Sequence, residues 1–139
     1  PLNMFRAATL FCLCALTLPN WAGAAPLPIT PVERALAFSS CAGRFSATAE
    51  LRYLFPDRDP SAAEARRDLF DEMLEAVLPH AIDAGLPPAL PLSIRIEAKA
   101  AQADLLHRAA FSADVLASVP ARKAADRYIA ECEAMLLGA

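Results

Sequence analysis

The chain has 139 residues, with 13 Lys and Arg against 16 Asp and Glu and a formal net charge of −3. This length suffices for one domain with its own core. The mildly acidic balance, with no basic patch, disfavours nucleic acid as a partner. With 4 glycines in all, the chain has no G-x-G-x-x-G or G-x-x-x-x-G-K-[ST] motif for cradling phosphates.

Residues 4–24 have the pattern of an export signal. Arg6 gives a positive start, residues 7–18 form an uncharged apolar run, and residues 22–24 (Ala-Gly-Ala) are the small-x-small end that a signal peptidase cuts. The run is shorter than the roughly 20 residues that span a bilayer as a helix, so we predict that it is removed. Residues 1–3 are expected to be spurious or fragmentary, as Pro1 cannot be an initiator.

The expected mature chain, residues 25–139, is a single helical domain located in the bacterial periplasm or secreted. Without Arg6 it has 12 basic and 16 acidic residues, which gives a net charge of −4. No apolar stretch beyond the signal is long enough to form a transmembrane segment.

Two cysteines remain in the mature chain, Cys41 and Cys132. An oxidising compartment favours a disulfide between them, and two separate buried thiols are the alternative. The chain-entropy model gives such a long loop roughly 4.5 kcal/mol of stabilisation, comparable to the net stability of a small domain. No C-x-x-C motif follows the signal, so a redox-active pair or a covalent haem is not supported.

The first predicted helix begins at a capping box formed by Thr30 and Glu33 and ends near Phe55, before Pro56. Its apolar stripe comprises Phe38, Cys41, Ala42, Phe45 and Ala49. Its small residues, which would let a neighbouring backbone approach closely, are Ser39, Ser40, Ala42 and Gly43.

The second predicted helix begins at a capping box formed by Ser61 and Glu64. Pro79 ends or kinks this helix, and Gly85 is its final stop if it continues past the kink. Its predicted apolar stripe comprises Ala65, Leu69, Met73, Ala76 and Val77, widened by Phe70, Leu74 and Leu78.

After the Pro-rich linker 86–91, residues 92–96 alternate between apolar and polar like a strand. No second strand is available to pair with them, and strong helix formers follow, so we predict a third helix over 91–110. Its expected faces carry Leu92, Ile96, Ala103 and Leu106, with Ile94, Ala101 and Leu105 alongside.

The last predicted helix covers 120–137, after a mixed stretch that has room for one short turn of helix. Its stripe comprises Ala121, Ala125, Tyr128, Cys132 and Met135. Four helices with short connections predict an all-α, antiparallel four-helix bundle. A disulfide between the first and last helices agrees with this topology, because both cysteines lie on apolar stripes at adjacent ends of the bundle.

The chain offers little for catalysis, so we predict no enzyme and no cofactor. His80 and His107 are its two histidines, and no G-x-S-x-G nucleophile motif is present. Asp104 and His107 share a helical face at i, i+3 and are weak metal candidates. A two-metal bundle site needs a second such pair, which the chain lacks.

We interpret the charged residues on the second and third predicted helices as structural rather than functional. The acidic residues Glu64, Asp68, Asp71, Glu72 and Glu75 fit a solvated helix face better than a patch for a basic partner. Among Arg95, Glu97 and Lys99, a charge turned inward would need a partner, for which Arg44 and Glu50 are candidates.

The stretch 41–47 (CAGRFSA), the stretch 94–106 (IRIEAKAAQADLL) and the late Cys132 resemble a group of small exported helical bacterial proteins with no assigned activity. The L-T-x-x-Q motif of helical periplasmic chaperones is missing. The resemblance implies a helical exported protein and no chemistry. We therefore expect a non-catalytic protein that binds another protein or an envelope component, with metal or small-ligand binding as the alternative and the oligomeric state left open.

Overall fold

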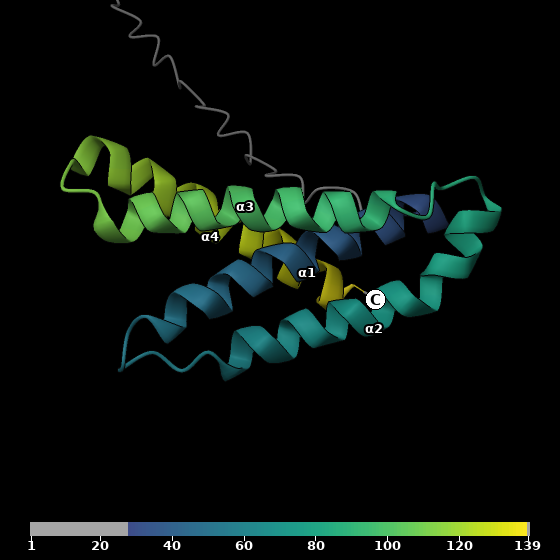
Figure 1. Ribbon diagram of the computed structural model, residues 1–139, viewed down its shortest axis with the longest axis horizontal. Helices are drawn as coiled ribbons and strands as arrows, with labels where there is room; N and C mark the ends of the chain where they lie inside the picture. Colours follow the sequence, from purple (N-terminus) through teal and green to yellow (C-terminus); the bar gives the residue numbers. More distant parts are fainter. Residues whose placement is uncertain (1–27, 139) are drawn as a thin grey trace, which may run out of the picture.

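The computed structural model describes residues 28–138, so the predicted export signal lies outside the described residues. The described chain forms four helices and no strand: α1 (Pro31–Tyr53), α2 (Ser61–Asp83), α3 (Leu90–Phe111) and α4 (Val115–Leu137). Consecutive helices run in opposite directions, whereas α1 and α3 run in the same direction (Figure 1). The predicted all-α four-helix bundle is confirmed. None of the described helices is long and apolar enough to cross a membrane.

The predicted start of α1 is confirmed. The hydroxyl of Thr30 accepts a hydrogen bond from the Glu33 backbone, and the Glu33 carboxylate accepts from the backbone N–H groups of Thr30 and Ile29. These backbone donors hold the pKa of Glu33 below its usual value. The cap therefore gives partners to N–H groups that the helix itself leaves unpaired.

The second predicted capping box is wrong. Pro60 is the residue before α2 and makes no side-chain cap, while Ser61 is already helical. Asp59 takes the capping role instead, because its carboxylate accepts from both the backbone N–H and the hydroxyl of Ser61, at 2.9 and 2.6 Å. Glu64 is then free to accept a hydrogen bond from the Tyr53 hydroxyl on α1.

Pro79 bends α2 without ending it. The helix continues to Asp83, and Figure 1 shows its last turns bent away from the direction of the first part. Gly85, at φ 98°, then ends it as predicted. The Gly85 N–H donates to Ile82 and the Leu86 N–H to Ala81, which is the Schellman arrangement.

The last helix begins earlier than the sequence predicts. Asp114 caps it by accepting from the Leu116 N–H at 2.8 Å, and Pro120 lies inside α4 rather than at its start. A proline near the beginning of a helix is tolerated here because the carbonyl that it leaves unpaired belongs to Leu116, whose residue is 86% exposed to solvent. The mixed stretch before Pro120 is thus the first turn of the same helix.

The predicted stripe of α1 is confirmed, and it forms the aromatic half of the core. All five of its residues are buried: Phe38, Cys41, Ala42, Phe45 and Ala49. Phe70 of α2 is fully buried between the rings of Phe38 and Phe45, with centroids 6.0 and 5.8 Å apart. Burying large aromatic side chains supplies much of the hydrophobic stabilisation between α1 and α2.

Another side of α1 is built from small residues, which were expected to admit a neighbouring backbone, and the helix that approaches it is α3. A Cβ added at Gly43 would overlap the carbonyl oxygen of Arg95 and lie 3.0 Å from the backbone N of Lys99. Ser39 and Ser46 are buried on this helix, with their hydroxyls bonded to its own carbonyls. Glycine is required at 43 because the two backbones are in contact there.

The predicted buried faces of α2 and α3 are partly wrong. On α2 the buried residues are Ala63, Phe70 and Ala81, while three members of the predicted stripe, Ala65, Leu69 and Ala76, are exposed. Since α2 packs mainly on α1, only a narrow stripe is covered, and it lies to one side of the predicted one.

On α3, Leu92 and Ile96 are 62% and 58% exposed, and Ala103 is also exposed. The buried residues are instead Pro91, Ala98 and Gln102. Large aliphatic side chains do not fit where two backbones touch, so the face of α3 that meets α1 is the one with an alanine at its centre.

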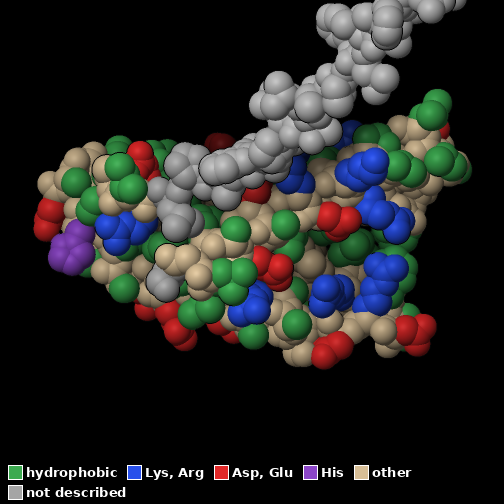
Figure 2. All heavy atoms as spheres, turned by 180° about the vertical axis from the view of Figure 1, so that it is seen from behind, with side chains coloured by type: hydrophobic (Ala, Val, Ile, Leu, Met, Phe, Trp, Pro, Cys, Tyr) green, Lys and Arg blue, Asp and Glu red, His purple; other side chains and the backbone are tan. Residues whose placement is uncertain are grey.

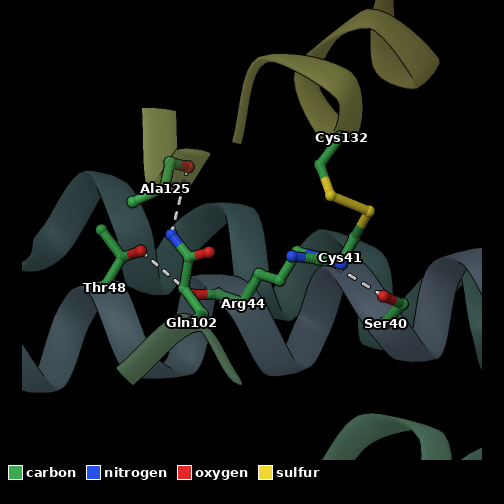
Figure 3. The surroundings of a disulfide bond; sticks show 7 residues. All are labelled: Ser40, Cys41, Arg44, Thr48, Gln102, Ala125 and Cys132. Carbon is green, nitrogen blue, oxygen red and sulfur yellow. Dashed lines mark hydrogen bonds between the residues drawn. A yellow bond between two sulfur atoms is a disulfide. The ribbon is translucent and has the colours of Figure 1, made fainter. Parts of the chain in front are cut away.

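The predicted disulfide joins α1 to α4. Cys41 and Cys132 are both buried, with their Cα atoms 5.6 Å apart (Figure 3). The first half of α4 packs along α3, and its end reaches the core between α1 and α2, where Met135 and Leu136 contact the aromatic cluster (Figure 1). The covalent bond therefore fixes the point at which α4 crosses α1.

Candidate binding groove

The end of α4 leaves an apolar groove between itself, α1 and α2. Its volume is about 540 Å³, within the range of small-molecule sites. The residues that line it are Pro28, Arg34, Phe38, Met73, Ala76, Val77, His80, Met135 and Gly138. The lining is thus mainly apolar with two basic side chains, a composition typical of binding pockets.

The two basic side chains of the groove come from the start of α1 and the end of α2, which lie side by side. Because α1 and α2 are antiparallel, the start of α1 meets the end of α2, where Ala35 and Ala81 pack in one cluster. Arg34 and His80 are the neighbours of these alanines in sequence. Toward the other end, Phe38 packs against Phe70 of the aromatic cluster. The groove therefore has a polar end and an apolar end.

The charge of Arg34 is available at the polar end. Its guanidinium donates to the backbone carbonyl of Ile29 at 3.0 Å, which orients it without neutralising it. The ion pairs found over residues 28–138 do not include Arg34. The nearby Glu33 carboxylate is occupied by the cap of α1.

The disulfide holds the α4 wall of the groove in place. Met135 lies one helical turn after Cys132, so the bond to Cys41 sets where the Met135 side chain meets Phe38 and α2. α4 comes close to α1 over only a short length. The covalent bond is therefore one of the contacts that set the geometry of the groove.

A buried and a half-buried polar side chain lie near the disulfide (Figure 3). Gln102 of α3 is fully buried and donates to the Ala125 carbonyl of α4 at 3.2 Å. Arg44 stacks its guanidinium on the Tyr128 ring, 3.9 Å from the centroid. Burial lowers the pKa of Arg44, and Tyr128 and Glu131 partly offset that effect. These contacts fix α4 against α1 and α3.

Charged residues in the first half of α3 pair with both neighbouring helices. Lys99 pairs with Glu50 of α1, one of the two candidate partners considered for an inward-turned charge. Arg95 binds Asp71 of α2 through two N–H···O contacts, of 2.5 and 3.0 Å, instead of meeting Glu50. Arg44 does not serve as a partner, because it stacks on Tyr128. The pairs connect α3 to both neighbouring helices.

The weak metal candidates do not meet a third ligand in the described chain. Asp104 pairs with Arg108 at 2.8 Å, and the His107 ring packs on Phe111 with centroids 4.6 Å apart. Over residues 28–138 no group of three or more His, Cys, Asp or Glu side chains could hold a metal ion. Asp104 and His107 therefore lie on the exposed side of α3 and are engaged by their own helix.

The acidic residues of α2 are partly used within the protein. Asp71 binds Arg95, Asp68 binds Arg67, and Glu64 binds Tyr53. Figure 2 shows acidic and basic side chains mixed over one face, with basic ones gathered toward the end that carries the α1–α2 and α3–α4 connections. This arrangement is typical of a solvated surface.

Comparison with known proteins adds no relative: no family model, no curated protein and no solved structure matches this chain.

Sequence reasoning missed the groove. It assigned Met73, Val77 and Met135 to apolar stripes, named His80 only as one of two histidines, and did not consider Arg34. The one available signal was the position of Met135 one turn after Cys132, which brings a flexible side chain to the disulfide-bonded part of the core.

Proposed function

We propose that this protein is an exported, non-catalytic binding protein that holds an apolar group of its partner in the groove between α1, α2 and the end of α4. The observation that supports it is the groove itself, a volume of about 540 Å³ walled by Phe38, Met73, Val77 and Met135. A cleft of this size and lining gains affinity by removing apolar surface from water.

The disulfide supports the exported location, because such bonds persist in oxidising compartments such as the periplasm or the extracellular space. Metal binding through Asp104 and His107 is the weaker alternative, because Arg108 and Phe111 occupy the two side chains. Small-ligand binding remains compatible with the groove.

The test uses decanol as an uncharged apolar probe and calorimetry as the measurement. Wild-type protein is expected to bind it saturably with one site. Ala76→Trp places a large ring at the exposed rim of the groove and is expected to abolish binding without unfolding the protein. Ala65→Trp is the matched control, since Ala65 is exposed on the same helix and outside the groove.

Two results would contradict the proposal. One is the absence of saturable binding in the wild-type chain. The other is equal binding by the Ala76→Trp and Ala65→Trp variants, which would place the probe elsewhere on the molecule.

A further inference from the structure

We infer that the groove binds a free single-chain amphiphile with an anionic head, a fatty-acid-like molecule, with its chain among Phe38, Met73 and Met135 and its head at Arg34. The inference rests on the proposed function and specifies its ligand. It is drawn from the polarity of the groove, which has Arg34 and His80 at one end and mainly apolar side chains along its walls.

The walls favour an acyl chain over a peptide. The N–H groups of Met73, Ala76 and Val77 are used within α2, and the lining side chains other than Arg34 and His80 are apolar. An extended peptide segment would bring its own N–H and C=O groups into this groove and find no row of main-chain partners there, which is costly. An acyl chain carries no such groups.

The two methionines in the walls of the groove suit a ligand with a flexible chain. Met73 of α2 and Met135 of α4 face the groove from two sides and pack against the aromatic cluster. Their unbranched thioether side chains adjust to irregular apolar shapes. A chain of variable conformation can therefore be covered without a fixed complementary surface.

Charge complementarity sets the head group. The polar end presents the guanidinium of Arg34 together with His80, and no carboxylate is among the described lining residues. Arg34 has spare donors after its bond to Ile29, and a guanidinium pairs well with a carboxylate. From Met73 to His80 the groove follows α2 for about 10 Å, so a linear chain can lie along it with its head at the open end.

The first test is a chain-length series from hexanoate to dodecanoate, measured by calorimetry on the full protein below micelle-forming concentrations. Affinity is expected to rise about fourfold for each added methylene until the groove is full, the factor expected for burying one CH₂. An affinity independent of chain length would overturn the inference.

The second test separates the head from the chain. Arg34→Gln is expected to weaken decanoate about two- to fivefold and leave decanol unchanged, as for an exposed ion pair. Arg34→Lys should recover most of the loss. Arg66→Gln is the control, an exposed arginine of α2 outside the groove, and should change neither ligand.

The outcomes distinguish this inference from the proposed function. If decanol binds as tightly as decanoate and Arg34→Gln changes neither, the anionic head is wrong and the apolar groove stands. If neither ligand binds, both proposals fail. If the protein bound anionic vesicles but not free decanoate, the inference that the ligand is a free molecule would be wrong.

Discussion

The two sides of α1 are packed by opposite means. Toward α2 the helix presents phenylalanine rings, and toward α3 it presents Gly43 and buried serines. The aromatic side keeps helices apart and, where the rings end, leaves the groove. The small-residue side brings two backbones into contact and leaves no room for a ligand. One helix therefore supplies both a wall of the groove and its rigid support.

Truncating the aromatic side should have the largest effect. Phe70→Ala removes the ring that lies between Phe38 and Phe45 and should cost about 3–5 kcal/mol of unfolding free energy. Guanidinium denaturation measures it. Leu116→Ala, at an exposed residue of α4, is the control and should stay within about 0.5 kcal/mol of wild type. Similar losses in the two variants would contradict the aromatic core.

Removing the disulfide should lower the stability of the protein and free the end of α4, which forms one wall of the groove. The double variant Cys41→Ala/Cys132→Ala should lose about 2–5 kcal/mol, because the bond restricts the unfolded chain and fixes the end of α4. Denaturation with and without a dithiol reductant measures it. The reductant should destabilise the wild type to the level of the variant and leave the variant unchanged. A wild type insensitive to the reductant at its unfolding midpoint would contradict this.

Replacing Gly43 by alanine, on the small-residue side of α1, should lower the stability of the protein, although this type of substitution usually raises the stability of a helix. Replacing an interior helical glycine by alanine normally stabilises by about 1 kcal/mol. Gly43→Ala should instead destabilise by about 1–3 kcal/mol, because the new methyl group would overlap the Arg95 backbone. Denaturation decides the sign, and a gain in stability would show that α1 and α3 are not in backbone contact.

The smallest expected effect on stability comes from the cap at the start of α1. This cap supports the whole helix, and so both its aromatic side and its small-residue side. The folded pKa of Glu33 is below its unfolded value, so its stabilisation is present above the unfolded pKa and is lost as the pH falls through the folded pKa. The difference in stability between wild type and Glu33→Ala should therefore shrink in acid. Leu116→Ala, at an exposed residue of α4 that carries no titrating group, is the control, and its difference from wild type should not change with pH. A difference that persists in acid would contradict the cap.

The sequence predicted what depends on local patterns. The stripe from Phe38 to Ala49, the Thr30 cap and the Gly85 stop follow from spacing and backbone preference, and the structure confirms each. The disulfide pairing also followed, since two cysteines on apolar stripes allow one bond.

The buried face of α3 could not be predicted in this way. It was wrong because a polar residue, Gln102, takes a buried position through one hydrogen bond, and because backbone contact at Gly43 excludes large side chains. The groove was missed for a different reason. It is a space left between helices, and its volume depends on where α4 crosses α1 rather than on any single residue.

The most direct measurement is the methyl NMR spectrum of methionine-labelled protein during a decanoate titration. Of the 3 methionines in the sequence, Met73 and Met135 line the groove from two different helices. Both of their methyl signals should shift with the same saturation curve as the calorimetric binding. If decanoate binds while both signals stay unchanged, the ligand lies elsewhere and the groove is not the binding site.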